Sequence, residues 1–65
     1  MKLTVNGRDI DFDKSTVMDL IIYYKLKSGG VAVEKNGELV KRDKFETEEL
    51  RDGDVLELVR FVGGG

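Results

Sequence analysis

The residues best suited to do chemistry in this 65-residue chain are its last three, Gly63, Gly64 and Gly65. They follow a strongly apolar stretch, residues 55–62. Glycine has no Cβ and loses much entropy when ordered, so such a run adds nothing to a core and is expected to extend into solvent. It offers an unhindered α-carboxylate on a slender tether, which can enter a channel that any side chain would block. The alternative is a frayed end without function.

Side-chain chemistry is sparse in the rest of the chain, because cysteine and histidine are both absent. There is no thiol for a disulfide or a cysteine metal site, so any sulfur carried covalently must sit elsewhere. The commonest general base and metal ligand are missing as well. Asp52 and Asp54 are paired carboxylates, but they lie in a turn pattern with no evident pocket. We therefore expect no metal site, no catalytic side chain and no enzyme activity of its own.

Charge and hydropathy narrow the class of partner. Eleven basic and thirteen acidic residues give a net charge of −2, whereas nucleic-acid-binding proteins usually cluster positive charge on one face. No apolar run approaches the ~20 residues that span a bilayer, and no signal-peptide pattern opens the sequence. We expect one small cytoplasmic domain that binds neither nucleic acid nor membrane.

Two Asn-Gly dipeptides, Asn6-Gly7 and Asn36-Gly37, predict two β-hairpins. Both central positions of a type I′ turn need φ > 0, which asparagine and glycine tolerate. Alternating apolar residues flank each dipeptide, as in half-buried strands. The four strands that we expect here are residues 2–5, 8–12, 31–35 and 38–40.

The residues between the hairpins change to a helical period. Thr16 can cap a helix, and Asp19 completes a pattern like a capping box. The predicted core-facing stripe consists of Val17, Leu20, Ile21 and Tyr24, widened by Met18 and Ile22. Lys25 and Lys27 suit the negative end of the helix dipole, and Ser28-Gly29-Gly30 should end the helix.

A final strand, residues 55–62, should follow a polar, irregular segment, residues 41–53, that is anchored on the core by Phe45 and Leu50. One helix can cover only one face of the sheet, so the expected fold is a two-layer α+β domain with an open sheet face.

Alternation in the final strand assigns its two faces. If Leu56 and Leu58 point to the helix, the side chains on the open face are Val55, Glu57, Val59 and Phe61. Exposed apolar groups beside a glycine terminus predict a partner-docking surface at Val59 and Phe61. The alternative is that residues 41–53 fold over these side chains.

The whole pattern resembles the ubiquitin-like β-grasp fold, and within it the ThiS/MoaD family of sulfur carriers. The resemblance rests on five stretches: residues 5–7, 16–21, 30–37, 50–59 and 62–65. It implies a mixed sheet of four to five strands with one helix packed across one face. It also implies a β-grasp domain over residues 1–62 and a flexible glycine tail over residues 63–65.

The resemblance to ThiS-type carriers implies sulfur transfer in thiamine (thiazole) biosynthesis. A ThiF-type enzyme would adenylate Gly65, and sulfur from a persulfide donor would convert it to a thiocarboxylate that serves a ThiG-like thiazole synthase. Gly63 and Gly64 would thread the tail into the enzymes, and Phe61 with Val59 would anchor both of them. ATP and metal would be held by the activating enzyme, with no cofactor on this chain.

Three alternatives remain open from the sequence. The small subunit of molybdopterin synthase, which is MoaD-like, uses the same thiocarboxylate chemistry. A ubiquitin-like protein modifier would join the glycine to a lysine of a target. A plain β-grasp interaction module would have a tail without a role.

Overall fold

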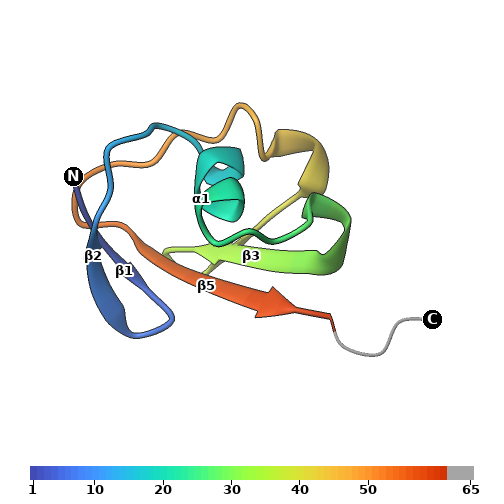
Figure 1. Ribbon diagram of the computed structural model, residues 1–65, viewed down its shortest axis with the longest axis horizontal. Helices are drawn as coiled ribbons and strands as arrows, with labels where there is room; N and C mark the ends of the chain where they lie inside the picture. The colour runs from blue at the N-terminus through green and yellow to red at the C-terminus, as the bar shows by residue number, and fades with distance from the viewer. Residues whose placement is uncertain (62–65) are drawn as a thin grey trace.

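A computed structural model of the protein describes residues 1–61. Its elements, in chain order, are β1 (Lys2–Val5), β2 (Arg8–Asp11), α1 (Val17–Tyr23), β3 (Val31–Lys35), β4 (Glu38–Val40) and β5 (Val55–Arg60). Two short 3₁₀ turns, Ser28–Gly30 and Arg42–Lys44, join them. The helix lies across one face of the sheet, which confirms the predicted two-layer α+β architecture (Figure 1). The predicted glycine tail, residues 63–65, and Val62 before it lie outside the described residues, so the predicted boundary between domain and tail stays a prediction.

The five strands form one mixed sheet in the order β2-β1-β5-β3-β4. The last strand is therefore central: it pairs parallel with β1 on one side and antiparallel with β3 on the other. Both predicted hairpins are present as antiparallel pairs. Their turns have positive φ at both central residues, at 50° and 80° for Asn6 and Gly7, and at 53° and 86° for Asn36 and Gly37. These values fit type I′ turns.

The helix begins at the predicted capping box. The Asp19 backbone N–H donates to Thr16 Oγ1 at 3.2 Å, and the Thr16 N–H donates to Asp19 Oδ2 at 3.1 Å. Two donors that a helix N-terminus would leave unpaired are thereby satisfied. The buried face of α1 consists of Val17, Leu20 and Ile21.

The helix is shorter than predicted, because it ends at Tyr23. Lys25 takes a left-handed φ of 58°, its N–H donates to Ile22 O, and the N–H of Leu26 donates to Ile21 O. These are the two hydrogen bonds of a Schellman motif. Leu26 packs against the core directly after this turn, so burial of its side chain favours the early end of the helix.

The structure corrects three predictions about α1. Tyr24 and Ile22 were expected in the buried stripe, but the two residues are 37% and 63% exposed. Ile22 lies within the helix, five residues after Val17, which turns its side chain about 140° away from that of Val17. Tyr24 is the C-cap residue, at the point where the helix ends. Lys25 and Lys27 lie beyond the last helical turn, so the predicted stabilisation of the helix dipole by these two lysines is wrong.

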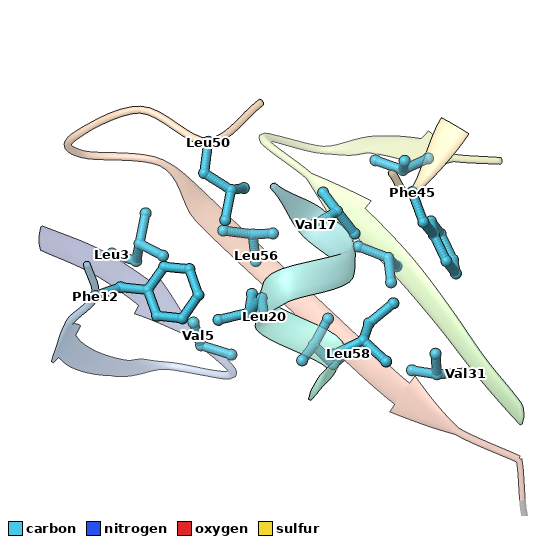
Figure 2. Close-up of a cluster of buried hydrophobic side chains, with 13 residues drawn as sticks. Leu3, Val5, Phe12, Val17, Leu20, Val31, Phe45, Leu50, Leu56 and Leu58 are labelled. Carbon is cyan, nitrogen blue, oxygen red and sulfur yellow. The ribbon is translucent and has the colours of Figure 1, made fainter. Parts of the chain in front are cut away.

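The core lies between α1 and the sheet, and Figure 2 shows its side chains converging from both layers. Phe45 and Leu50 are buried in it, as predicted, although Arg42–Lys44 form a 3₁₀ turn within the segment expected to be irregular. That segment crosses the helix side of the molecule (Figure 1). It bonds to the start of α1 through Val17 N to Glu48 O and Met18 N to Phe45 O. The open face of the sheet is therefore left uncovered by residues 41–53.

Candidate docking site at the end of the last strand

The position of the chain just before the glycines is fixed by β5. Five consecutive residue pairs join β5 to β3, ending with Arg60 opposite Val31. The ladder continues one residue further, because the N–H of Phe61 donates to Gly30 O at 2.9 Å. The last described residue is thus held to the sheet by its backbone.

Both hairpin-turn asparagines bind the backbone of β5 as well. Asn6 Oδ1 accepts from the Leu58 N–H at 2.8 Å, and Asn6 Nδ2 donates to Leu58 O at 3.1 Å. On the other side of the strand, Asn36 Oδ1 accepts from the Val55 N–H at 2.9 Å. Sequence reasoning assigned these residues only to turns. The available signal was the choice of asparagine in place of aspartate, because only an amide can both donate and accept.

Asp54 fixes the start of β5 and is the one buried charged residue among those described. Asn36 Nδ2 donates to its Oδ1 at 3.0 Å, and the Arg51 N–H donates to its Oδ2 at 2.8 Å. Burial acts to raise the pKa of this carboxyl, but the two hydrogen bonds, together with the charges of Lys35 and Arg51, outweigh it and hold the pKa below its ordinary value of 3.8. Asp52 instead accepts from the Lys2 N–H. The two carboxylates are therefore structural, in the turn predicted for them.

The face assignment of β5 is confirmed. Leu56 and Leu58 are buried, whereas Val55, Val59 and Phe61 are 46%, 57% and 62% exposed. The two residues predicted to dock partners, Val59 and Phe61, thus lie in the open on the side opposite the helix. The predicted threading residues Gly63 and Gly64 and the predicted reactive residue Gly65 lie outside the described residues.

Two residues that sequence reasoning missed extend this surface. Ala32 of β3 pairs with Val59, and Leu39 of β4 pairs with Glu34 on the same face. Leu39 is 67% exposed, and it lines a shallow hollow together with Ala32 and Phe61. We call these four residues, Ala32, Leu39, Val59 and Phe61, the open-face patch. Only the order of the strands brings them together, so the sequence pattern could not have shown the patch.

A metal-ligand cluster and a membrane-spanning helix are both missing from the described part of the chain. Residues 1–61 contain no group of three side chains placed to hold a metal ion. In the same range, no helix is long and apolar enough to cross a membrane. The open-face patch is therefore the candidate site among the described residues.

Known proteins resemble this chain over its whole length. The model of the ThiS family matches residues 3–65. The sulfur carrier protein ThiS of Bacillus subtilis is 42% identical over 97% of this chain and 98% of its own length. A crystal structure of the thiamine biosynthesis protein ThiS from Geobacter metallireducens superimposes with a TM-score of 0.80, at 39% identity and with full coverage of both chains. A thiazole synthase of Paramagnetospirillum magneticum is 42% identical to the whole chain, which covers 20% of that protein.

The fold, the family model and the full-length relative agree, and they confirm the predicted β-grasp fold. The names of the family and of the full-length relative describe a sulfur carrier protein and not an enzyme. The chain belongs to the ThiS family, the sulfur carrier proteins of thiamine biosynthesis.

Proposed function

We propose that the chain carries sulfur as a thiocarboxylate on Gly65. The observation that carries this proposal is the family match, which extends through Gly65. Two properties of the chain support it. The sequence has no cysteine to hold sulfur on a side chain. β5 and the hydrogen bond from the Phe61 N–H to Gly30 O fix the backbone up to Phe61, four residues before Gly65.

The proposed chemistry begins with activation, because a carboxylate does not exchange its oxygen with a sulfur nucleophile unaided. A carboxylate oxygen of Gly65 attacks the α-phosphate of ATP, which forms an acyl-adenylate and releases pyrophosphate. The terminal sulfur of a persulfide donor then attacks the acyl carbon, and AMP leaves. A thiol reduces the resulting S–S bond and frees the thiocarboxylate.

In this proposal a ThiF-type activating enzyme holds the ATP, its metal ion and the donors that stabilise the developing charge. A ThiG-like thiazole synthase then receives the sulfur. Sequences similar to this chain make up 20% of two thiazole synthases, at 42% and 32% identity. The presence of a carrier-like sequence within those two proteins supports direct binding between the carrier and the synthase.

The open-face patch is the proposed docking surface for both enzymes. Val59 and Phe61 are its best candidates for anchors, because both lie on the stretch of chain that leads to the tail. Phe61 has the further advantage that binding energy concentrates on buried aromatic anchors. Gly63 and Gly64 would then enter the active site of each enzyme without a side chain to obstruct it.

Phe61→Ala tests the docking step. We expect it to weaken binding to both enzymes by about 1–3 kcal/mol, measured by calorimetric titration, with little change in melting temperature. Unaltered affinity of Phe61→Ala beside a large fall in melting temperature would show that Phe61 serves the fold.

Gly64→Val is the complementary variant and tests the entry of the tail into the activating enzyme. It should abolish ATP–pyrophosphate exchange by that enzyme, because the valine side chain obstructs the channel.

A further inference from the structure

A second surface borders the end of β5 on the helix side of the sheet. A hollow of about 450 Å³ lies between the first hairpin and the end of α1, with Arg8, Tyr24 and Arg60 on its walls. An adjoining hollow of about 260 Å³ shares Leu26 and Arg60 with it and adds Lys25 and Lys27. We call the two together the basic groove, after its four cations Arg8, Lys25, Lys27 and Arg60.

The basic groove is positive although the chain as a whole is negative. No acidic residue lines either hollow, and the net charge of the chain is −2. The ion pairs found among residues 1–61 are Lys2 with Asp11 and Lys35 with Glu48. Within that range, the four groove cations therefore have no carboxylate within 4.0 Å. Asp9, which follows Arg8, accepts instead from Thr4 Oγ1.

The backbone around the groove is well fixed. Arg60 points to the helix side because it shares that face with Leu58, whose backbone Asn6 holds. Lys25 occupies the left-handed position of the Schellman motif. The positive field is thus a property of the folded chain. Burial raises the pKa of Tyr24, as does the neighbouring Tyr23, while the charge of Arg8 opposes both; this places Arg8 within electrostatic reach of Tyr24.

We propose that the basic groove binds an acidic segment of the enzyme that adenylates the terminal glycine. This inference rests on the proposed function and names a second contact for the same partner. Unpaired cations beside a docking surface attract a complementary acidic surface and speed its association.

The form of the groove favours a protein segment over a small anion. Its cations are spread along two open, adjoining hollows, whereas small-ligand sites are concave and enclose most of the ligand. Phe61 lines the second hollow and also belongs to the open-face patch. An enzyme that surrounds the end of β5 would therefore reach the apolar patch on one side and the basic groove on the other.

Charge reversal with a matched control tests the proposal. The groove variant is Arg8→Glu with Arg60→Glu, and the control is Lys14→Glu with Lys44→Glu, which changes the net charge equally at exposed sites outside the groove. At low salt we expect the groove variant to associate with the activating enzyme about tenfold more slowly or worse. The control should change less than about threefold, and high salt should abolish the difference. Arg8→Gln with Arg60→Gln, which introduces no new charge, replaces the groove variant if melting shows that the latter is unfolded.

Equal effects of the groove and control variants, or no effect of either, would overturn the groove as a docking site. Mass spectrometry after prolonged incubation separates this failure from that of the proposed function: if wild type never gains sulfur, the carrier chemistry itself is wrong.

An NMR titration is a second, independent test of the groove. We expect hexaglutamate to shift the amide signals of Arg8 and Arg60. Saturable shifts with inorganic pyrophosphate, and none with the peptide, would instead assign a small-anion site.

Discussion

The ionisation of Asp54 matters to the described fold, because its carboxylate ties Asn36 and Arg51 to the start of β5. Its pKa lies below the ordinary value of 3.8 in the folded chain. The pKa of Asp19 is lowered too, first by the Thr16 N–H and then by the Ser15 N–H. Both carboxylates thus stay ionised to lower pH in the folded chain than in the unfolded chain.

A pH dependence of stability follows from these two groups. Their contribution is complete above pH 3.8 and is lost as the pH falls through the folded-state pKa values. Asp54→Asn should be less stable than wild type by about 1–3 kcal/mol at neutral pH, and its stability should depend less on pH in the acid range. Urea unfolding of both proteins across that range measures this. Parallel pH profiles would show that Asp54 contributes no charge-dependent stability.

The turn that ends α1 carries a residue type that is disfavoured by its backbone conformation. Lys25 adopts φ 58° at a position where glycine is usual, and the left-handed region disfavours residues that have a Cβ. We predict that Lys25→Gly raises the free energy of unfolding by on the order of 1 kcal/mol. Thermal melting measures the change, and Lys27→Gly, outside the turn, is the control. A loss of stability in Lys25→Gly would show that the lysine side chain supports the turn.

Alternation along β5 gives a matched pair of variants in adjacent residues. Leu58→Ala should cost about 2–5 kcal/mol as a truncation in the core. Val59→Ala, on the open face, should cost less than about 1 kcal/mol, yet it should weaken partner binding. Denaturant unfolding and calorimetric titration separate the two effects. Equal losses of stability would mean that the open face is covered by something the described residues do not include.

The elements that could be predicted from the sequence are those determined by interactions between residues close together in the chain. Asn-Gly turns and the Thr16–Asp19 capping box are determined within a few residues, and they were predicted correctly. The end of α1 depends on where Leu26 is buried, which is a property of the folded domain. The open-face patch and the basic groove depend on strand order, because β5 pairs with strands far from it in the chain, as in Thr4 with Val55.

At the scale of the whole molecule, the last strand connects stability with function. It lies in the middle of the sheet, so the stretch that leads to the glycines is also the one that closes the core. Its end separates an apolar surface from a positive one. A small domain of this kind can keep its fold while partners act on its terminus, because the buried core residues lie between Leu3 and Leu58.

The central claim is that sulfur is carried on Gly65, and tandem mass spectrometry of the loaded protein tests it most directly. The chain would be incubated with its activating enzyme, ATP, a persulfide donor and a thiol. We predict that its mass changes by the exchange of one oxygen for one sulfur, and that the change maps to the fragment that contains Gly65. An unchanged mass in the presence of an activating enzyme shown to be active, or sulfur on an internal residue, would contradict the account.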